Sequence, residues 1–192
     1  MRLRLLAFLL VAVLLLFAAC AKKGNSPASA SSGAPSSDGS VTLGDGRVSF
    51  IPPPNLKQLT KEQIAASKFN KNKPPDYLFA NDSKTVTVGV VFNFIDLKPE
   101  ELEDYLYANH RLLSMAIADV QFVTEEIVDI NNRKWAHFEV MSDAPDVALH
   151  NHQYTTSFNG GALVFGFNST VKEYEQYKDA LLKSAQSIQV KD

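Results

Sequence analysis

The apolar positions of this chain fall into two regions that are separated by a polar stretch. An almost unbroken apolar run covers residues 5–17, and residues 21–40 contain no Leu, Ile, Val, Met or aromatic residue. From Val41 onward, apolar residues recur with the short periods of strands and helices. The pattern predicts a leader (1–19), a flexible Ser/Ala/Gly/Pro linker that begins at Cys20 (20–40) and a single folded domain (41–192).

The clearest strand signal lies in residues 85–94. Val86, Val88 and Val90 alternate there with Thr and Gly, which is the period of two expected for a strand with one apolar face. We expect this strand to lie centrally in a sheet. Turn-forming triplets and pairs of Gly, Asn and Asp separate the other expected strands. These strands are 41–43, 47–51, 77–80, 120–130, 133–141, 147–158 and 162–168.

Three segments carry helix signals. Thr60 and Gln63 have the spacing of a capping box and predict a helix to about residue 68, and Thr170 and Glu173 predict a second box. Pro99, followed by acidic residues, predicts the start of a helix to about residue 118. The last helix has an apolar stripe that we expect in the core, and two apolar residues close the chain after it: Tyr174, Tyr177, Leu181 and Ala185, then Ile188 and Val190.

The order of the expected elements is ββ-α-ββ-α-ββββ-α. Strands and helices that occur in separate runs favour an antiparallel β-sheet with helices packed on it. We therefore expect the α+β class.

The leader has the three parts of a secretory signal peptide. Arg2 and Arg4 precede the apolar run, and Ala18-Ala19-Cys20 follows it. The run of thirteen residues is shorter than the about 20 that a membrane-spanning helix needs. This ending resembles the bacterial lipobox, in which the cysteine receives diacylglycerol and becomes the first residue after cleavage. Phe17 stands where that motif usually has Leu.

Cys20 is the only cysteine, so the chain forms no internal disulfide. Lipidation with fatty acyl chains such as palmitate would cap its thiol and anchor the protein to membrane lipid. The alternative is an ordinary secreted protein with a chance cysteine. Because Ala21 rather than Asp follows Cys20, the resemblance to lipoproteins implies the outer membrane, facing the periplasm, if the host is Gram-negative.

Charge argues against one class of partner. The chain has 19 Lys and Arg against 21 Asp and Glu. Loss of Arg2 and Arg4 with the leader leaves 17 basic residues, a net charge of −4. A mildly acidic domain is not expected to bind nucleic acid.

Histidines provide the candidate site. His150 and His152 are two residues apart, so on a strand they share one face. If strands 133–141 and 147–158 pair, His137 and Glu139 lie opposite them, and three imidazoles with a carboxylate would suit zinc. The alternative is that these histidines lie on a solvated sheet face without a ligand, since the sequence does not determine the register or the face.

The sequence offers no other chemistry. It contains no G-x-S-x-G, no glycine-rich phosphate loop and no second cysteine. We therefore expect no catalytic residue, no enzyme activity and no cofactor apart from the lipid on Cys20. His110, beside the apolar stripe of its helix, is expected at the boundary between buried and exposed surface, and Trp135 in the core.

Several landmarks together resemble the PsbP/Mog1-like α/β sandwich, and within it bacterial lipoproteins of the DcrB/LpqN kind. They are the segment 47–53, the strand 86–94, the helix from Pro99, the strand 135–140, the Gly160-Gly161 turn into 163–165, and the end of the last helix at 184–188. The resemblance implies a membrane-anchored, non-catalytic envelope lipoprotein whose domain binds another envelope component. Two alternatives stay open: an immunity or inhibitor lipoprotein against a periplasmic toxin, and a periplasmic metal-binding protein that uses His137, His150 and His152.

Overall fold

The structure is a computed structural model that describes residues 37–67, 74–92, 95–144 and 147–191. The expected leader, Cys20 and most of the linker lie outside these residues. The first strand, β1, begins at Val41. None of the helices in the described ranges is both long and apolar enough to cross a membrane.

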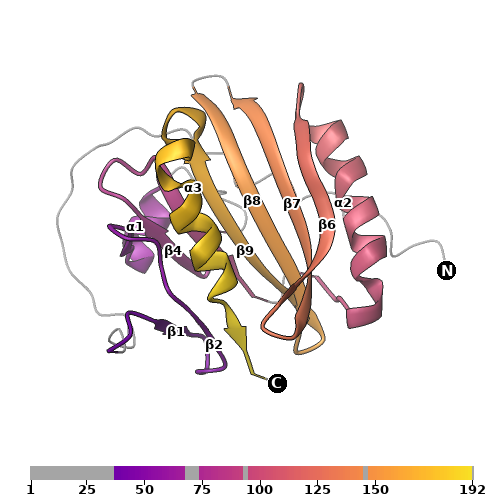
Figure 1. The fold of residues 1–192 in the computed structure, drawn as a ribbon, viewed down its shortest axis with the longest axis horizontal. Helices are drawn as coiled ribbons and strands as arrows, with labels where there is room; N and C mark the ends of the chain where they lie inside the picture. The colour runs from indigo at the N-terminus through magenta and orange to yellow at the C-terminus, as the bar shows by residue number, and fades with distance from the viewer. Residues whose placement is uncertain (1–36, 68–73, 93–94, 145–146, 192) are drawn as a thin grey trace.

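A seven-stranded antiparallel sheet forms the centre of the domain (Figure 1). All neighbouring strands in it run antiparallel, and helices pack on it, so the expected α+β class is confirmed. Its strands in spatial order are β3 (Lys57–Gln58), β4 (Tyr77–Ala80), β5 (Val86–Val91), β9 (Gly161–Thr170), β8 (Val147–Phe158), β7 (Arg133–Ala144) and β6 (Gln121–Ile130).

A second sheet joins the two ends of the domain. Its order is β1 (Val41–Leu43), β2 (Val48–Phe50) and β10 (Gln189–Val190). Neither β10 nor β3 was expected from the sequence, because a two-residue strand is too short to show alternation.

Helices cover both faces of the large sheet. α3 (Val171–Gln186) and the small sheet share one face, where Trp135 of β7 belongs to the same core as Leu181 of α3 (Figure 1). α2 (Leu102–Ala116), preceded by the 3-10 turn η2 (Pro99–Glu101), lies on the other face, where Phe138 of β7 packs with Leu113. Strand alternation sends Trp135 and Phe138 to opposite faces. The short helix α1 (Lys61–Ala66) packs on β4.

Several expected boundaries are corrected. β5 ends at Val91, and residues 93–94 of the expected strand lie outside the described residues. β5 lies inside the sheet as expected, although the middle position belongs to β9, in which every residue is buried. α1 ends at Ala66 rather than 68, and β7 continues to Ala144 rather than 141. Pro99 begins η2, so α2 starts three residues later than expected.

One of the two capping boxes is confirmed. Gln63 N–H donates to Thr60 Oγ1 at 3.2 Å, and Thr60 N–H donates to Gln63 Oε1 at 2.8 Å. Thr170 is the N-cap of α3, but its side chain makes no capping bond to the backbone. Its hydroxyl donates to the Glu173 carboxylate at 3.3 Å instead, so the second box is wrong in that detail.

Candidate functional site: a buried histidine and carboxylate cluster

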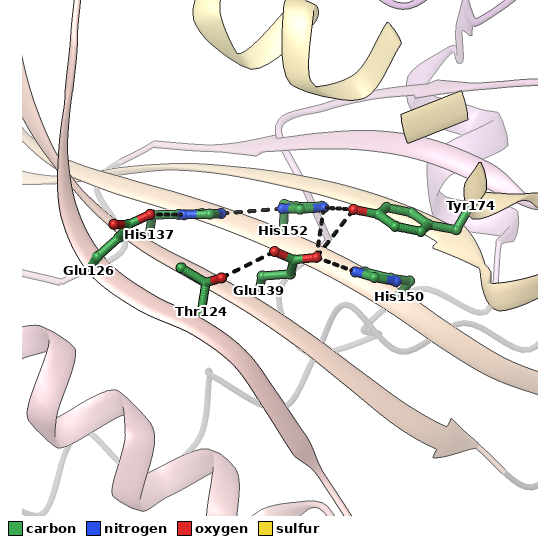
Figure 2. Close-up of polar contacts among 7 residues, drawn as sticks. All are labelled: Thr124, Glu126, His137, Glu139, His150, His152 and Tyr174. Carbon is green, nitrogen blue, oxygen red and sulfur yellow. Dashed lines mark hydrogen bonds and ion pairs between the residues drawn. The ribbon is translucent and has the colours of Figure 1, made fainter. Parts of the chain in front are cut away.

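The register of β7 and β8 brings the predicted residues together. Glu139 pairs with His152, His137 with Tyr154 and Met141 with His150. The side chains of His137, Glu139, His150 and His152 therefore lie on one face of the sheet, as the period of two predicts. This face is the one that α3 covers, and Figure 2 shows Glu139, His150 and His152 meeting Tyr174 from the first turn of α3, with His137 on the far side of His152.

Four donor atoms converge at the centre of this group. Glu139 Oε1 lies 2.7 Å from His150 Nε2 and 3.8 Å from His152 Nε2. The Tyr174 hydroxyl lies 2.9 Å from His152 Nε2 and 3.2 Å from Glu139 Oε1. We call Glu139, His150, His152 and Tyr174 the four-donor cluster (Figure 2).

His137 lies beside this cluster rather than in it. Its Nε2 is 3.2 Å from His152 Nδ1, on the side of the ring that faces away from Glu139. Its Nδ1 is 3.5 Å from Glu126 Oε1 on β6. A line of contacts thus runs from Glu126 through His137 and His152 to Tyr174 (Figure 2).

The hypothesis of a solvated histidine face is wrong. His137 and His150 are 6% exposed and His152 is 2% exposed. These residues lie on β7 and β8, which are interior strands, beneath α3. The Glu139 side chain retains 16% exposure, so the cluster meets solvent on that side.

Ring stacking holds the imidazoles in place. Tyr174 stacks on His150 with ring centroids 3.4 Å apart and planes 16° apart. Tyr154 stacks on His137 at 4.3 Å and 7°. Because these rings are fixed by packing, the nitrogens of the cluster are held in defined directions.

Burial determines the protonation of the histidines. It lowers the pKa of His152 to about 4, despite the nearby charge of Glu139, and it lowers the pKa of His137 as well. Both rings are therefore neutral near pH 7. Each then carries one N–H, and its other nitrogen is a free acceptor or ligand.

The pKa values of Glu139 and Tyr174 are shifted in opposite directions. Burial alone raises the pKa of Glu139, but the hydrogen bond from His150 and the charges of His152 and His150 outweigh it, so the pKa lies below its usual value. Burial and the charge of Glu139 raise the pKa of Tyr174. The cluster at neutral pH thus holds a charged carboxylate and a protonated phenol.

Two residues of this region were not anticipated. Tyr174 was expected only in the apolar stripe of the last helix, and no local signal places its hydroxyl beside residues 35 positions away. The position of Glu126 could have been predicted from the sequence. The two-residue turn at Asn131 and Asn132 places Ile130 opposite Arg133, and counting back along that register places Glu126 opposite His137.

The remaining histidine lies elsewhere. His110 on α2 has its Nδ1 2.8 Å from Glu125 Oε1 and stacks on Phe122, with its side chain 42% exposed. It lies on the opposite face of the sheet and matches the boundary position expected for it.

The fold places the domain in a known structural class. No protein-family model matches the chain, and no curated protein matches it. The arrangement of an antiparallel sheet with helices on both faces is the PsbP-like α+β fold, so the PsbP/Mog1-like resemblance is confirmed as a fold.

Individual solved structures give the extent of this similarity. Cyanobacterial PsbP (CyanoP) from Synechocystis sp. PCC 6803 matches with a TM-score of 0.54 and 14% identity over 79% of this chain and 91% of that chain. A Bacteroides thetaiotaomicron protein matches with a TM-score of 0.50 and 12% identity over 80% of this chain and 48% of that chain. LpqN of Mycobacterium tuberculosis, involved in cell envelope biogenesis, matches with a TM-score of 0.44, 12% identity, and coverage of 80% and 90%. Identities at this level show the fold alone.

Proposed function

We propose that this protein is a lipid-anchored component of the bacterial envelope whose α+β domain binds another envelope component without catalysing a reaction. The observation that carries the proposal is the leader that ends in Ala18-Ala19-Cys20, followed by a polar linker and then by β1 at Val41. Cleavage before Cys20 makes the acylated cysteine the first residue of the protein.

Anchoring and reach follow from simple magnitudes. Each buried methylene of an acyl chain contributes about 0.8 kcal/mol, so two or more chains anchor a protein stably. A flexible linker of the length of residues 21–40 spans about 25 Å root-mean-square. The domain therefore searches a thin layer next to the bilayer, which raises its effective concentration toward a partner in that layer.

The burial of the polar cluster favours binding over catalysis. The His152 side chain is covered by α3, and its Nε2 is engaged with the hydroxyl of Tyr174. A catalytic acid or base must come within hydrogen-bond reach of a substrate. The His152 ring is 2% exposed and its Nε2 already has a partner, so it offers a substrate no free acid or base.

The anchor is tested by Cys20→Ser expressed in the native host, with Ser26→Ala in the linker as the matched control. We expect wild type and the control in the membrane fraction, with a diacylglyceryl group on the first residue by mass spectrometry. Cys20→Ser should lose the acyl mass. Wild-type protein that keeps residues 1–19, or that carries an unmodified thiol at Cys20, would contradict the anchor.

The binding role is tested by crosslinking in intact cells, comparing wild type with a soluble form that carries a cleavable secretory leader and Ser at position 20. We expect wild type to capture an envelope component and the unanchored form to capture much less, because the anchor supplies the effective concentration. Tight, anchor-independent recovery of one hydrolase would support the inhibitor alternative instead.

A further inference from the structure

The four-donor cluster has the composition and size of a metal site. Its three ligand-type residues, Glu139, His150 and His152, each place one donor atom within 4.8 Å of the others. We propose that these three residues bind one zinc ion, with the Tyr174 hydroxyl at the fourth position. The proposal goes beyond the anchoring and binding roles and does not depend on them.

The distances fit a tetrahedral shell. Zinc lies about 2.0–2.1 Å from imidazole nitrogen and carboxylate oxygen, so neighbouring ligands of a tetrahedron lie about 3.3–3.4 Å apart. The separations from Glu139 Oε1 are 2.7 Å to His150 Nε2, 3.2 Å to Tyr174 Oη and 3.8 Å to His152 Nε2. The Tyr174 hydroxyl is 2.9 Å from His152 Nε2. These values lie on both sides of the ideal edge, and all three ligand atoms of Glu139, His150 and His152 lie within 4.8 Å of one another, so zinc binding requires these side chains to adjust around the ion.

The donor set also selects the metal. Two imidazoles, a carboxylate and a phenol oxygen suit zinc better than calcium or magnesium, which prefer shells of oxygen only. In the hydrogen-bonded network His150 carries a proton on Nε2, because Glu139 Oε1 can only accept from it at 2.7 Å. Zinc takes the place of that hydrogen, so binding requires the tautomer of His150 that carries its ring hydrogen on Nδ1 and leaves the Nε2 lone pair for the ion.

His137 orients a ligand and is not itself one. Glu126 Oε1 lies 3.5 Å from His137 Nδ1 and favours the ring hydrogen on that nitrogen, which leaves His137 Nε2 as an acceptor for His152 Nδ1–H. His152 then presents the lone pair of Nε2 to the cluster. Ligating histidines in proteins almost always have such a partner on the second nitrogen. The sequence-based ligand set of His137, His150, His152 and Glu139 is thereby revised, with His137 as a positioning residue.

The geometry indicates a closed, metal-holding site. A catalytic zinc keeps one position open for water or substrate, whereas structural sites have four protein ligands. Here the Tyr174 hydroxyl would take the fourth position, and Tyr174, which α3 contributes, is 6% exposed. Zinc would reach the site past Glu139 and the half-exposed Glu126.

The test uses the full-length chain purified in detergent and stripped of metal with a chelator. Isothermal titration with Zn²⁺ should give one ion per chain with micromolar affinity or tighter. Co²⁺ should give the intense visible bands of tetrahedral coordination. Failure to bind either ion stoichiometrically, or the weak spectrum of six-coordinate Co²⁺, would overturn the proposal on wild-type protein alone.

Variants assign the roles. Glu139→Gln is nearly isosteric, so folding is retained, and we expect the zinc affinity to fall by more than about 100-fold with loss of the tetrahedral spectrum. His137→Gln should weaken binding by about 10- to 100-fold while the one-to-one ratio and the spectrum stay. His110→Gln is the matched control, because that histidine also pairs with a glutamate but lies on the opposite face. An equal loss in His110→Gln and Glu139→Gln would show that zinc binds elsewhere.

Discussion

Tyr105 shows how one hydroxyl is held between a helix and the sheet. It extends from α2 toward β8, where Gln153 Nε2 donates to its oxygen at 3.0 Å and Thr155 Oγ1 lies 3.3 Å away. Burial raises the pKa of Tyr105, although these two hydrogen bonds act in the opposite direction. The phenol therefore keeps its proton at a pH where the unfolded chain has lost it.

This difference predicts a loss of stability at high pH. A folded-state pKa above the unfolded value of about 10 gives stabilisation that is present below pH 10 and is lost as pH rises through the folded pKa. We expect Tyr105→Phe to cost about 1 kcal/mol at pH 7, from the lost hydrogen bonds, and to show a smaller further loss than wild type above pH 10. Urea unfolding at pH 7 and above pH 10 measures the free energy of unfolding of both proteins.

Tyr107→Phe is the control for that experiment. Tyr107 lies on the same helix with 68% of its surface exposed. Loss of its hydroxyl should therefore change neither the free energy of unfolding nor the pH dependence of that free energy. Equal pH dependence in wild type and in both variants would contradict the account.

At the scale of elements, one turn joins a hairpin to a helix. Asn131 and Asn132, which connect β6 to β7, have φ angles of 48° and 64°, in the left-handed region. The Asn131 side-chain amide donates to the carbonyls of Gln186 at 3.1 Å and Ile188 at 2.8 Å, at the end of α3. The turn therefore holds the C-terminal end of α3 against the sheet.

We expect the two asparagines to respond differently to substitution. Asn131→Ala loses both hydrogen bonds and places Ala at positive φ, so it should destabilise the protein by about 2 kcal/mol. Asn132→Gly should be neutral or slightly stabilising, because glycine adopts positive φ without strain and no described bond of the Asn132 side chain is lost. Thermal unfolding compares the stability of the two variants. Equal losses of stability would show that the hydrogen bonds from Asn131 to α3 contribute nothing.

The elements with long, regular patterns were the predictable ones. The alternation of Val86, Val88 and Val90 and the turn signal of Asn131 each depend on a few neighbouring residues. The two-residue strands β3 and β10 leave no such pattern, because they form only through pairing with β4 and β2. The capping bond expected at Thr170 is absent: its hydroxyl donates to Glu173, and its oxygen accepts no backbone N–H of α3.

The candidate site was likewise predictable only in the part that depends on local patterns. Strand alternation predicts that His150 and His152 share a face, and the register of β7 and β8, which the sequence left open, brings His137 and Glu139 to the same face. The burial of that face depends on α3, which arrives from the end of the chain, and so does the position of Tyr174. Contacts of that range depend on the packing of the whole domain, and the periodicity of a single strand carries no information about them.

At the scale of the whole molecule, the chain closes on itself through Ile188, which is 1% exposed in the main core. It leads from α3 into β10, which pairs with β2, and Ser187 Oγ accepts from Ile51 N–H at 2.8 Å.

Ile188→Ala should therefore cost about 2–5 kcal/mol and release β1 and β2 together, because the small sheet packs through this side chain. Urea unfolding with hydrogen exchange measures both effects. Val171→Ala, 41% exposed at the start of α3, is the control and should change stability little. Unchanged exchange in β2 of Ile188→Ala would show that the small sheet folds independently of the chain end.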